Sequence, residues 1–260
     1  MKTGFTTMGT PGMSVEEIFS VAREYNFDSV DLRLHKDGQI IDAITDSEAN
    51  DLLDMAGNIE LFSLLCYNTT IGNGIEEMVD SILKCVEIGE KLNLTAVRIF
   101  SGRIENKERL QDFCLVLKKV FESYKGNINL LVQNHKNLGV SCGQAIEISK
   151  QVKDMRFGFI FSPDQATKNG ENYMSLLKEL IPVTKQVYIA DINVDGQYCL
   201  IGKGIVPLKE ILLKMKEYGF DGYITLKWEK CWCDYLPSFN EGAKSFFDFL
   251  NGVIDDWSKS

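Results

Sequence analysis

The sequence predicts a (β/α)8 barrel, a closed ring of eight parallel strands with a helix after each strand. Short apolar runs alternate along the whole chain with longer segments whose apolar residues recur every three or four positions. The length of 260 residues suits one such barrel. No linker, low-complexity tract or charge block marks a second domain. We therefore expect one domain over residues 1–260.

The expected elements follow one another through short connections. Ser14 and Glu17 form the capping-box pattern of a helix start, and Pro207 and Gly219 are typical of the start and end of a helix between the last two strands. The predicted strands are Thr3–Met8, Phe27–Leu34, Ile59–Tyr67, Thr95–Phe100, Ile128–Gln133, Phe157–Phe161, Val187–Ile192 and Tyr223–Trp228. The predicted helices are Ser14–Tyr25, Asp46–Gly57, Ile75–Leu92, Lys107–Tyr124, Cys142–Val152, Tyr173–Leu180, Pro207–Gly219 and Phe239–Trp257.

Two internal repeats support this count. Residues 25–30 (YNFDSV) and 218–223 (YGFDGY) repeat the passage from a helix end into a strand. Residues 34–38 (LHKDG) and 134–137 (NHKN) resemble each other in composition and in their place after a strand.

Composition excludes several classes of partner. A net charge of −9 with interspersed acids and bases disfavours nucleic acid. No apolar run reaches about 18 residues, and the N-terminus lacks the apolar core of a signal peptide. We therefore expect a cytoplasmic protein without a membrane partner; a homo-oligomer stays open. The seven cysteines are scattered, and the Cys231–Cys233 spacing differs from zinc and redox motifs, so structural thiols are expected.

Polar residues that follow the strands mark a candidate site at the carboxyl end of the barrel, where barrel enzymes carry their chemistry. The only two histidines, His35 and His135, both fall there. A single loop histidine is usually just solvated, but two at one rim favour a pocket. Arg33 and Arg98 suit an anionic or polyhydroxylated ligand, or Arg33 pairs with a carboxylate such as Asp31 or Glu60. Asp164 is expected to end the sixth strand after a turn-like Ser-Pro.

The stretch from Gln186 to Trp232 places four more polar residues at the ends of two parallel strands: Tyr188, Asp191, Lys227 and Glu229. Asp191 is expected to cap local backbone amides instead of meeting a ligand.

Two further features of this stretch carry weaker signals. The segment 202–204 (GKG) is a short glycine pattern for a phosphate cradle. Trp228 and Trp232 are expected to pack in the core or at the rim, with stacking on a sugar face as the alternative.

The order and spacing of these segments resemble the xylose isomerase-like TIM barrels, which include sugar-phosphate isomerases and epimerases and a related type of AP endonuclease. The matching segments are FDSVDLRLH (27–35), AVRIFSG (96–102), LLVQNHK (130–136), FGFIFSPDQA (157–166), VYIAD (187–191), LIGKGIVPLKEIL (200–212) and YGFDGYITLKWEKCW (218–232).

The resemblance implies a divalent metal held by Glu, Asp, His and Glu on strands five to eight, with the two glutamates often moving the substrate proton. The corresponding residues are Gln133, Ser162, Tyr188 and Lys227. An amide, a hydroxyl and a phenol are weak ligands for such a metal. An ammonium about 4 Å from a divalent ion costs about 8 kcal/mol at an effective dielectric of about 20. We therefore expect no metal and no other cofactor, with Lys227 facing the other three positions.

Two hypotheses for function remain. In the first, the protein is a metal-independent sugar or sugar-phosphate isomerase or epimerase in which Lys227 acts as electrophile and His135 or Glu229 moves the proton. The substrate-binding residues would be Arg33, His35, Arg98, Gln133, Asp164 and Tyr188. In the second, it is a catalytically silent barrel that binds a sugar-like ligand, since both usual acid–base glutamates are absent. A DNA-repair role is disfavoured by the acidic charge.

Overall fold

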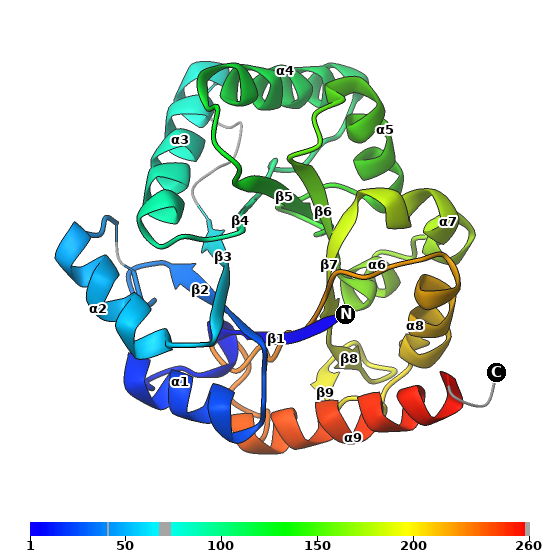
Figure 1. Ribbon diagram of the computed structural model, residues 1–260. Helices are drawn as coiled ribbons and strands as arrows, with labels where there is room; N and C mark the ends of the chain where they lie inside the picture. Colours follow the sequence, from blue (N-terminus) through cyan, green and yellow to red (C-terminus); the bar gives the residue numbers. More distant parts are fainter. Residues whose placement is uncertain (41, 68–73, 258–260) are drawn as a thin grey trace.

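Eight parallel strands close into a barrel at the centre of the computed structural model, which describes residues 1–40, 42–67 and 74–257 without the side chains of 255–257 (Figure 1). Around the ring the strands follow the order β1-β10-β7-β6-β5-β4-β3-β2. They are β1 Lys2–Thr6, β2 Ser29–Leu34, β3 Glu60–Cys66, β4 Ala96–Ile99, β5 Asn129–Gln133, β6 Phe157–Phe161, β7 Thr184–Ile189 and β10 Tyr223–Leu226. Because β1 pairs in parallel with β10, the predicted fold and its predicted closure are confirmed.

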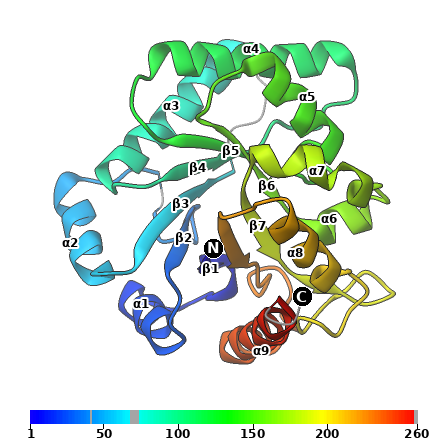
Figure 2. The ribbon, with the colours of Figure 1, turned by 45° about the vertical axis from the view of Figure 1, so that its right-hand side comes forward.

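Helices form an outer layer around this ring, as two views of the ribbon show (Figures 1 and 2). They are α1 Val15–Glu24, α2 Asp46–Ala56, α3 Ile75–Lys91, α4 Lys107–Ser123, α5 Cys142–Val152, α6 Pro163–Lys168, α7 Leu177–Leu180, α8 Leu208–Glu217 and α9 Phe239–Trp257. Within the described ranges, the structure contains no helix of the length and apolarity that a membrane span requires.

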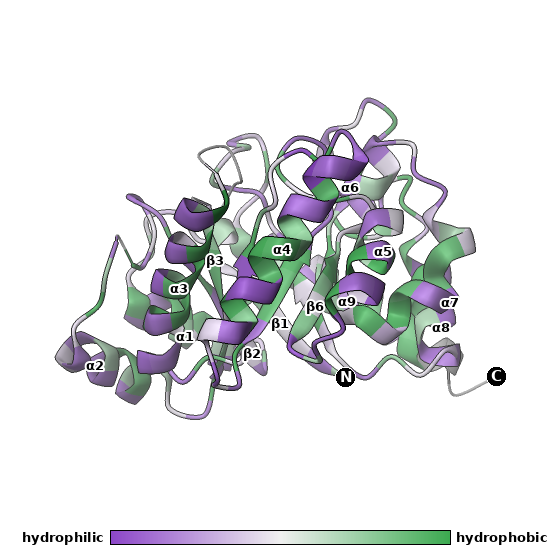
Figure 3. Ribbon diagram, turned by 90° about the horizontal axis from the view of Figure 1, so that it is seen from above, coloured by the Kyte–Doolittle hydropathy of each residue, from purple (hydrophilic) through white to green (hydrophobic). Residues whose placement is uncertain are grey.

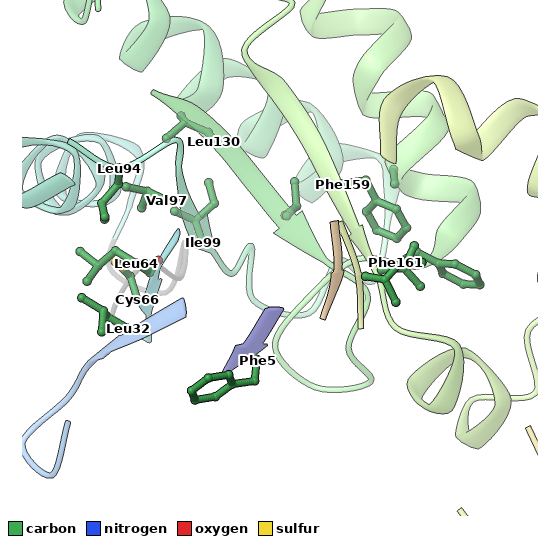
Figure 4. Packing of buried hydrophobic residues seen from close by; sticks show 14 of the residues in the cluster. Phe5, Leu32, Leu64, Cys66, Leu94, Val97, Ile99, Leu130, Phe159 and Phe161 are labelled. Atoms are coloured by element: carbon green, nitrogen blue, oxygen red, sulfur yellow. Dashed lines mark hydrogen bonds between the residues drawn. The ribbon is translucent and has the colours of Figure 1, made fainter. Parts of the chain in front are cut away.

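The apolar side chains of the strands divide between two layers. Outward-facing residues such as Leu64, Val97 and Phe159 pack under the helices (Figure 4), whose apolar faces turn inward (Figure 3). A smaller cluster fills the inside of the barrel: Phe62, Ala96, Leu131, Ile160 and Tyr188. Burial of apolar surface contributes about 25 cal/mol per Å² and stabilises both layers. The inner cluster also closes the barrel below the polar residues of its carboxyl end.

Local signals for helix ends are confirmed. Ser14 and Glu17 form both hydrogen bonds of a capping box at the start of α1. Gly219 follows α8 with φ of 84°, a conformation in which glycine has no steric cost.

β6 has the predicted bounds, but the segment after it differs from the turn that was expected. The strand ends at Phe161, and Pro163 begins the short helix α6 instead of a turn. Proline is well suited to the first helical position because its fixed φ is helical and its missing N–H is not needed there. Asp164 therefore lies in the first turn of a helix, with its side chain held close to the barrel axis.

The seventh strand also ends earlier than predicted. β7 stops at Ile189, and Asp191 starts a separate strand, β8 (Asp191–Ile192), which pairs in antiparallel fashion with β9 (Tyr198–Cys199). An apolar run alone does not reveal where a buried strand leaves its sheet. This hairpin places Tyr198 at the carboxyl end of the barrel.

Candidate functional site

The ammonium of Lys227 lies at the centre of the carboxyl end. Residues alternate along β10, so Lys227, two positions after Thr225, points inward. Its Nζ lies 2.7 Å from Asp164 Oδ2, 3.2 Å from Ser162 Oγ and 3.3 Å from Glu229 Oε1. The side chains of Lys227 and Asp164 are 1% and 0% exposed, while that of Glu229 is 12% exposed. Glu229 is therefore the member of this group with the most access to solvent.

Mutual attraction keeps this buried pair charged. Burial acts to lower the pKa of Lys227, but the carboxylates of Asp164 and Glu229 outweigh it and raise the pKa above its usual value. Burial likewise acts to raise the pKa of Asp164, but Lys227 and the Ser162 hydroxyl lower it on balance. Asp164 and Glu229 together supply the counter-charge that keeps Lys227 protonated.

Tyr198 closes over this group and was missed in the sequence. Its hydroxyl lies 3.1 Å from Asp164 Oδ2 and 3.4 Å from Glu229 Oε1, and it accepts a hydrogen bond from Gln165 Nε2 at 3.0 Å. Lys168 Nζ lies 3.7 Å from the centre of its ring. Tyr198 lies in β9, six positions after the end of the predicted strand Val187–Ile192, and only its place on the carboxyl face could have indicated it.

His135 follows β5 at the same rim. The backbone N–H of Asn137 donates to its Nδ1 at 3.4 Å, so the neutral ring carries its proton on Nε2. Burial, and then the positive charges of Lys227 and Arg98, lower the pKa of His135 to about 4. The ring is therefore neutral near pH 7.

A row of rings crosses the mouth and connects the two histidines. His135 meets Phe100 edge-on at 5.6 Å, Phe100 lies 6.3 Å from Tyr67, and Tyr67 lies 5.6 Å from His35. The guanidinium of Arg98 lies over both central rings, 4.0 Å from Phe100 and 4.5 Å from Tyr67. This contact holds the buried cation in place.

Arg33 belongs to the other side of the mouth. Its Nη1 donates to Cys231 Sγ at 3.0 Å, and its Nη2 lies 3.2 Å from His35 Nδ1. The ring of Trp232, which is largely exposed, lies 5.4 Å from the guanidinium. Trp228, in contrast, is a core residue whose indole N–H donates to Pro237 O.

The alternative ion pair for Arg33 is not formed with either acid named for it. Asp31 Oδ2 instead accepts hydrogen bonds from Gln186 Nε2 at 2.7 Å and from the Tyr188 hydroxyl at 3.4 Å. Glu60 pairs with Lys2. The Tyr188 hydroxyl thus turns to the barrel interior, and the expectation that Lys227 faces it is wrong. Gln133, predicted for the same group, is buried at the end of β5.

Asp191 binds backbone amides, as the sequence predicts. Its Oδ2 accepts from the N–H groups of Gly202 and Gly204 at 3.0 and 2.8 Å, and its Oδ1 from those of Ile192 and Val206. Because a carboxylate already holds the glycine amides, the phosphate cradle considered for residues 202–204 is wrong.

The comparisons with known proteins agree with this fold. The sequence model of the xylose isomerase-like TIM barrel family matches residues 19–248. The chain belongs to the xylose isomerase-like TIM barrel family. A search of curated proteins finds no match to this member of the family.

Several solved structures are similar to this xylose isomerase-like barrel. D-psicose 3-epimerase from Clostridium cellulolyticum H10, determined with D-tagatose, has a TM-score of 0.75 and 14% identity, covering 97% of this chain and 99% of that one. The probable 3-DHS dehydratase AsbF from Bacillus anthracis has a TM-score of 0.75 and 15% identity, covering 95% and 99%. A xylose isomerase domain containing protein from Salmonella typhimurium LT2 has a TM-score of 0.77 and 14% identity, covering 97% of each.

The residues present do not fit the divalent metal that this family implies. The corresponding positions offer an amide, a hydroxyl, a phenol and an ammonium, and the ammonium of Lys227 already occupies the carboxylates of Asp164 and Glu229. Across the described ranges, no three His, Cys, Asp or Glu side chains are grouped so that they could hold a metal ion. We therefore derive no chemical step through a metal.

Proposed function

We propose that the protein is a sugar or sugar-phosphate isomerase or epimerase that moves a proton at the carbon beside a carbonyl without a divalent metal. The observation that carries this proposal is the Lys227 ammonium, held by Asp164 and Glu229 at a family metal-ligand position. A fixed cation there can stabilise the negative oxygen of an enediolate, which is the work a metal does in such reactions. Family membership supports the reaction class.

Lys227 serves in this proposal as a cation and not as a base. Its raised pKa keeps it protonated, so the neutral amine that an unpaired lysine would offer is not available. Its three N–H bonds face Ser162, Asp164 and Glu229. A substrate oxygen must replace one of these, and the contact with Glu229 is the longest and the most exposed.

Displacement of this contact frees Glu229 to act as the base. Its carboxylate removes the proton from the carbon beside the carbonyl, the electron pair moves to the carbonyl oxygen, and Lys227 stabilises the charge that forms there. His135, neutral with its proton on Nε2, donates a hydrogen bond to a neighbouring sugar oxygen. Returning the proton to the former carbonyl carbon gives an isomer, with the proton of the neighbouring hydroxyl passing to the former carbonyl oxygen. An epimer forms instead when an acid on the opposite face protonates the original carbon.

One observation favours a second function, a silent sugar-binding barrel. All three donors of Lys227 are satisfied by the protein, and Tyr198 covers both of its carboxylate partners. If a ligand leaves this network intact, it would bind above Tyr198 without access to Glu229.

Exchange of substrate hydrogen in D₂O separates the two functions. With a panel of ketoses and ketose phosphates, we expect deuterium at the carbon beside the carbonyl, detected by NMR. Glu229→Gln should slow exchange at least about 100-fold, the lower range for loss of a general base, whereas Glu217→Gln on the surface of α8 should not. Binding without exchange would establish the silent barrel.

A chelator tests metal independence separately. Exchange should continue at an unchanged rate after EDTA treatment, and Lys227→Glu combined with Gln133→Glu, Ser162→Asp and Tyr188→His should increase Mn²⁺ binding. Exchange that stops with EDTA and returns with Mn²⁺ would overturn the assignment of Lys227.

A further inference from the structure

A cavity of about 330 Å³ opens at the rim beside His135. Three segments line it: the loop from β5 to α5, the loop after β4, and the end of α6. Its lining is mostly polar or charged, with Ile104 and Val140 as the apolar exceptions. This volume is at the lower end of the range for small-ligand pockets. The cavity suits part of a ligand, such as a polar substituent.

Positive charge dominates this cavity. Arg103, Lys136 and Lys168 contribute to its lining, and Glu171 is the one acid in it. Arg103 pairs with Glu105 outside the lining at 3.5 Å, so Lys136 and Lys168 carry the charge that is open to a ligand. Glu171 Oε2 accepts a hydrogen bond from the backbone N–H of Cys142 at 2.8 Å, so its charge is held at the start of α5. This concentration of cations contrasts with the net charge of −9 for the chain. A cationic corner on an acidic protein favours an anionic ligand there.

Lys168 connects the cavity with the group around Lys227. Its ammonium lies over the Tyr198 ring and makes no ion pair within the described parts of the chain. Burial, which here outweighs the attraction of Asp164, lowers the pKa of Lys168. His135 lines the same cavity and has a pKa lowered in part by Lys168. Lys168 therefore connects the lining of the cavity to Tyr198, whose hydroxyl contacts Asp164 and Glu229.

We propose that this cavity is the subsite for the phosphate group of a phosphorylated ketose, with Lys168 and Lys136 compensating its charge. The inference rests on the proposed function and specifies its substrate class. The reacting carbonyl would lie at Lys227 and Glu229 and the phosphate ester beyond His135. Lys136 and Lys168, which make no ion pair among the described residues, match the two charges of a phosphate dianion, whereas a carboxylate carries only one charge.

The test compares ketoses with their phosphate esters by isothermal titration calorimetry. D-ribulose 5-phosphate should bind at least about 10-fold more tightly than D-ribulose, the lower range for hydrogen bonds to a charged group. Lys136→Met with Lys168→Met should bring the affinity for D-ribulose 5-phosphate down to that for D-ribulose. The matched control is Lys36→Met with Lys203→Met, which makes the same change of charge. Lys36 lies in the loop after β2 that is equivalent to the loop of Lys136, and Lys203 lies elsewhere on the rim. This control should keep the difference in affinity between the two ketoses.

Other outcomes separate the subsite from the proposed function. Equal binding of D-ribulose and its phosphate, or an equal loss in both double variants, would overturn the subsite while Glu229-dependent exchange kept the function. If neither ketose binds, the proposed function fails, and the binding of inorganic phosphate to the wild type and to both double variants then tests the subsite. Phosphate binding that only the Lys136/Lys168 double variant loses supports it; any other result overturns it.

Discussion

Asp31, on β2 inside the barrel, and Asp164, in the first turn of α6, are both shielded from water but have different partners. Asp31 accepts hydrogen bonds from the neutral Gln186 and Tyr188, and its Oδ1 has no partner. Burial raises the pKa of Asp31 to about 7 despite these bonds. Asp164 faces Lys227 at 2.7 Å, and its pKa is lowered. Equal burial thus gives opposite pKa shifts, because Asp164 contacts a cation directly whereas the charge of Arg98 has only a small effect on the pKa of Asp31.

Because their pKa values shift in opposite directions, Asp164 and Asp31 also have different roles in the molecule. The pair of Asp164 and Lys227 keeps fixed charges at the mouth, where they can act on a ligand. Asp31 takes up a proton near neutral pH below the mouth, where it affects stability. The following experiments test this difference between the two carboxyls, in order of decreasing expected effect.

Lys227→Met removes the counter-charge of Asp164. When one partner of a buried ion pair stays behind without its counter-charge, the free energy of unfolding falls by about 3–5 kcal/mol. Urea denaturation at pH 8 measures this loss. The variant Lys227→Met with Asp164→Asn removes both charges and should recover part of this loss. A loss of less than about 1 kcal/mol for the single variant, the range for surface ion pairs, would contradict the buried pair.

The pH dependence of the stability of Lys227→Met tests the direction of the pKa shift of Asp164. In the wild type, the lowered pKa of Asp164 contributes stability that is present above the unfolded pKa and is lost as the pH falls through the folded one. Without Lys227, burial raises the pKa of Asp164, so Lys227→Met should lose least at pH 5 and most at pH 8. The double variant with Asp164→Asn should lack this slope.

Asp31→Asn removes a carboxyl whose contribution to stability changes with pH in the opposite direction from that of Asp164. A carboxyl whose folded pKa is about 7 binds more protons in the native state, so it destabilises the fold progressively from about pH 4 to pH 7. The free energy of unfolding of the variant should therefore rise relative to that of the wild type as the pH increases. Between pH 4 and pH 8.5 the difference between the two proteins should change by on the order of 2–4 kcal/mol in favour of the variant. Urea denaturation at both pH values measures this, and parallel curves would show that Asp31 is charged throughout.

Tyr198→Phe should have a moderate effect. It removes a hydroxyl bonded to Asp164 and Gln165 and should cost about 1–2 kcal/mol in unfolding free energy. Tyr188→Phe is the matched change beside Asp31, where the bond is longer at 3.4 Å, and should cost less than about 1 kcal/mol. If Tyr188→Phe proved the more damaging, the Tyr198 contact with the charged group would be unimportant.

The titration of His135 should show the smallest effect. NMR of the two histidines should find one with a pKa of about 4. In Lys227→Met this pKa should rise, because a positive charge is lost, yet stay below the usual histidine value, because burial is the larger cause. An unchanged titration would mean that the field of Lys227 does not reach His135.

Much of the fold and part of the candidate site could be predicted from local pattern. Alternation along each strand placed Arg33, Lys227 and Glu229 at the carboxyl end, and the repeat after two strands placed the histidines there. The two repeated loops adopt one geometry, in which the N–H of residue 37 or 137 donates to the ring nitrogen two residues earlier. These features depend on neighbours within a few positions.

The contacts across the barrel could not be predicted in the same way. Asp31 and Gln186 are 155 positions apart, and the Tyr198 hydroxyl reaches Asp164 from a hairpin whose existence the apolar run concealed. A carboxylate partner was one of the two alternatives for Arg33, but Arg33 contacts Cys231 and His35.

The order of strands and helices, the apolar faces of these elements and the helix ends at Ser14 and Gly219 could be predicted from the amino-acid sequence. Each follows from residue type and from periods of two or 3.6 residues. Which inward-facing residues meet depends on the tertiary structure, because ring closure and strand stagger are properties of all eight strands together. That geometry gave Lys227 to Asp164 and left Asp31 with neutral partners, and so determined the opposite pKa shifts of the two carboxyls.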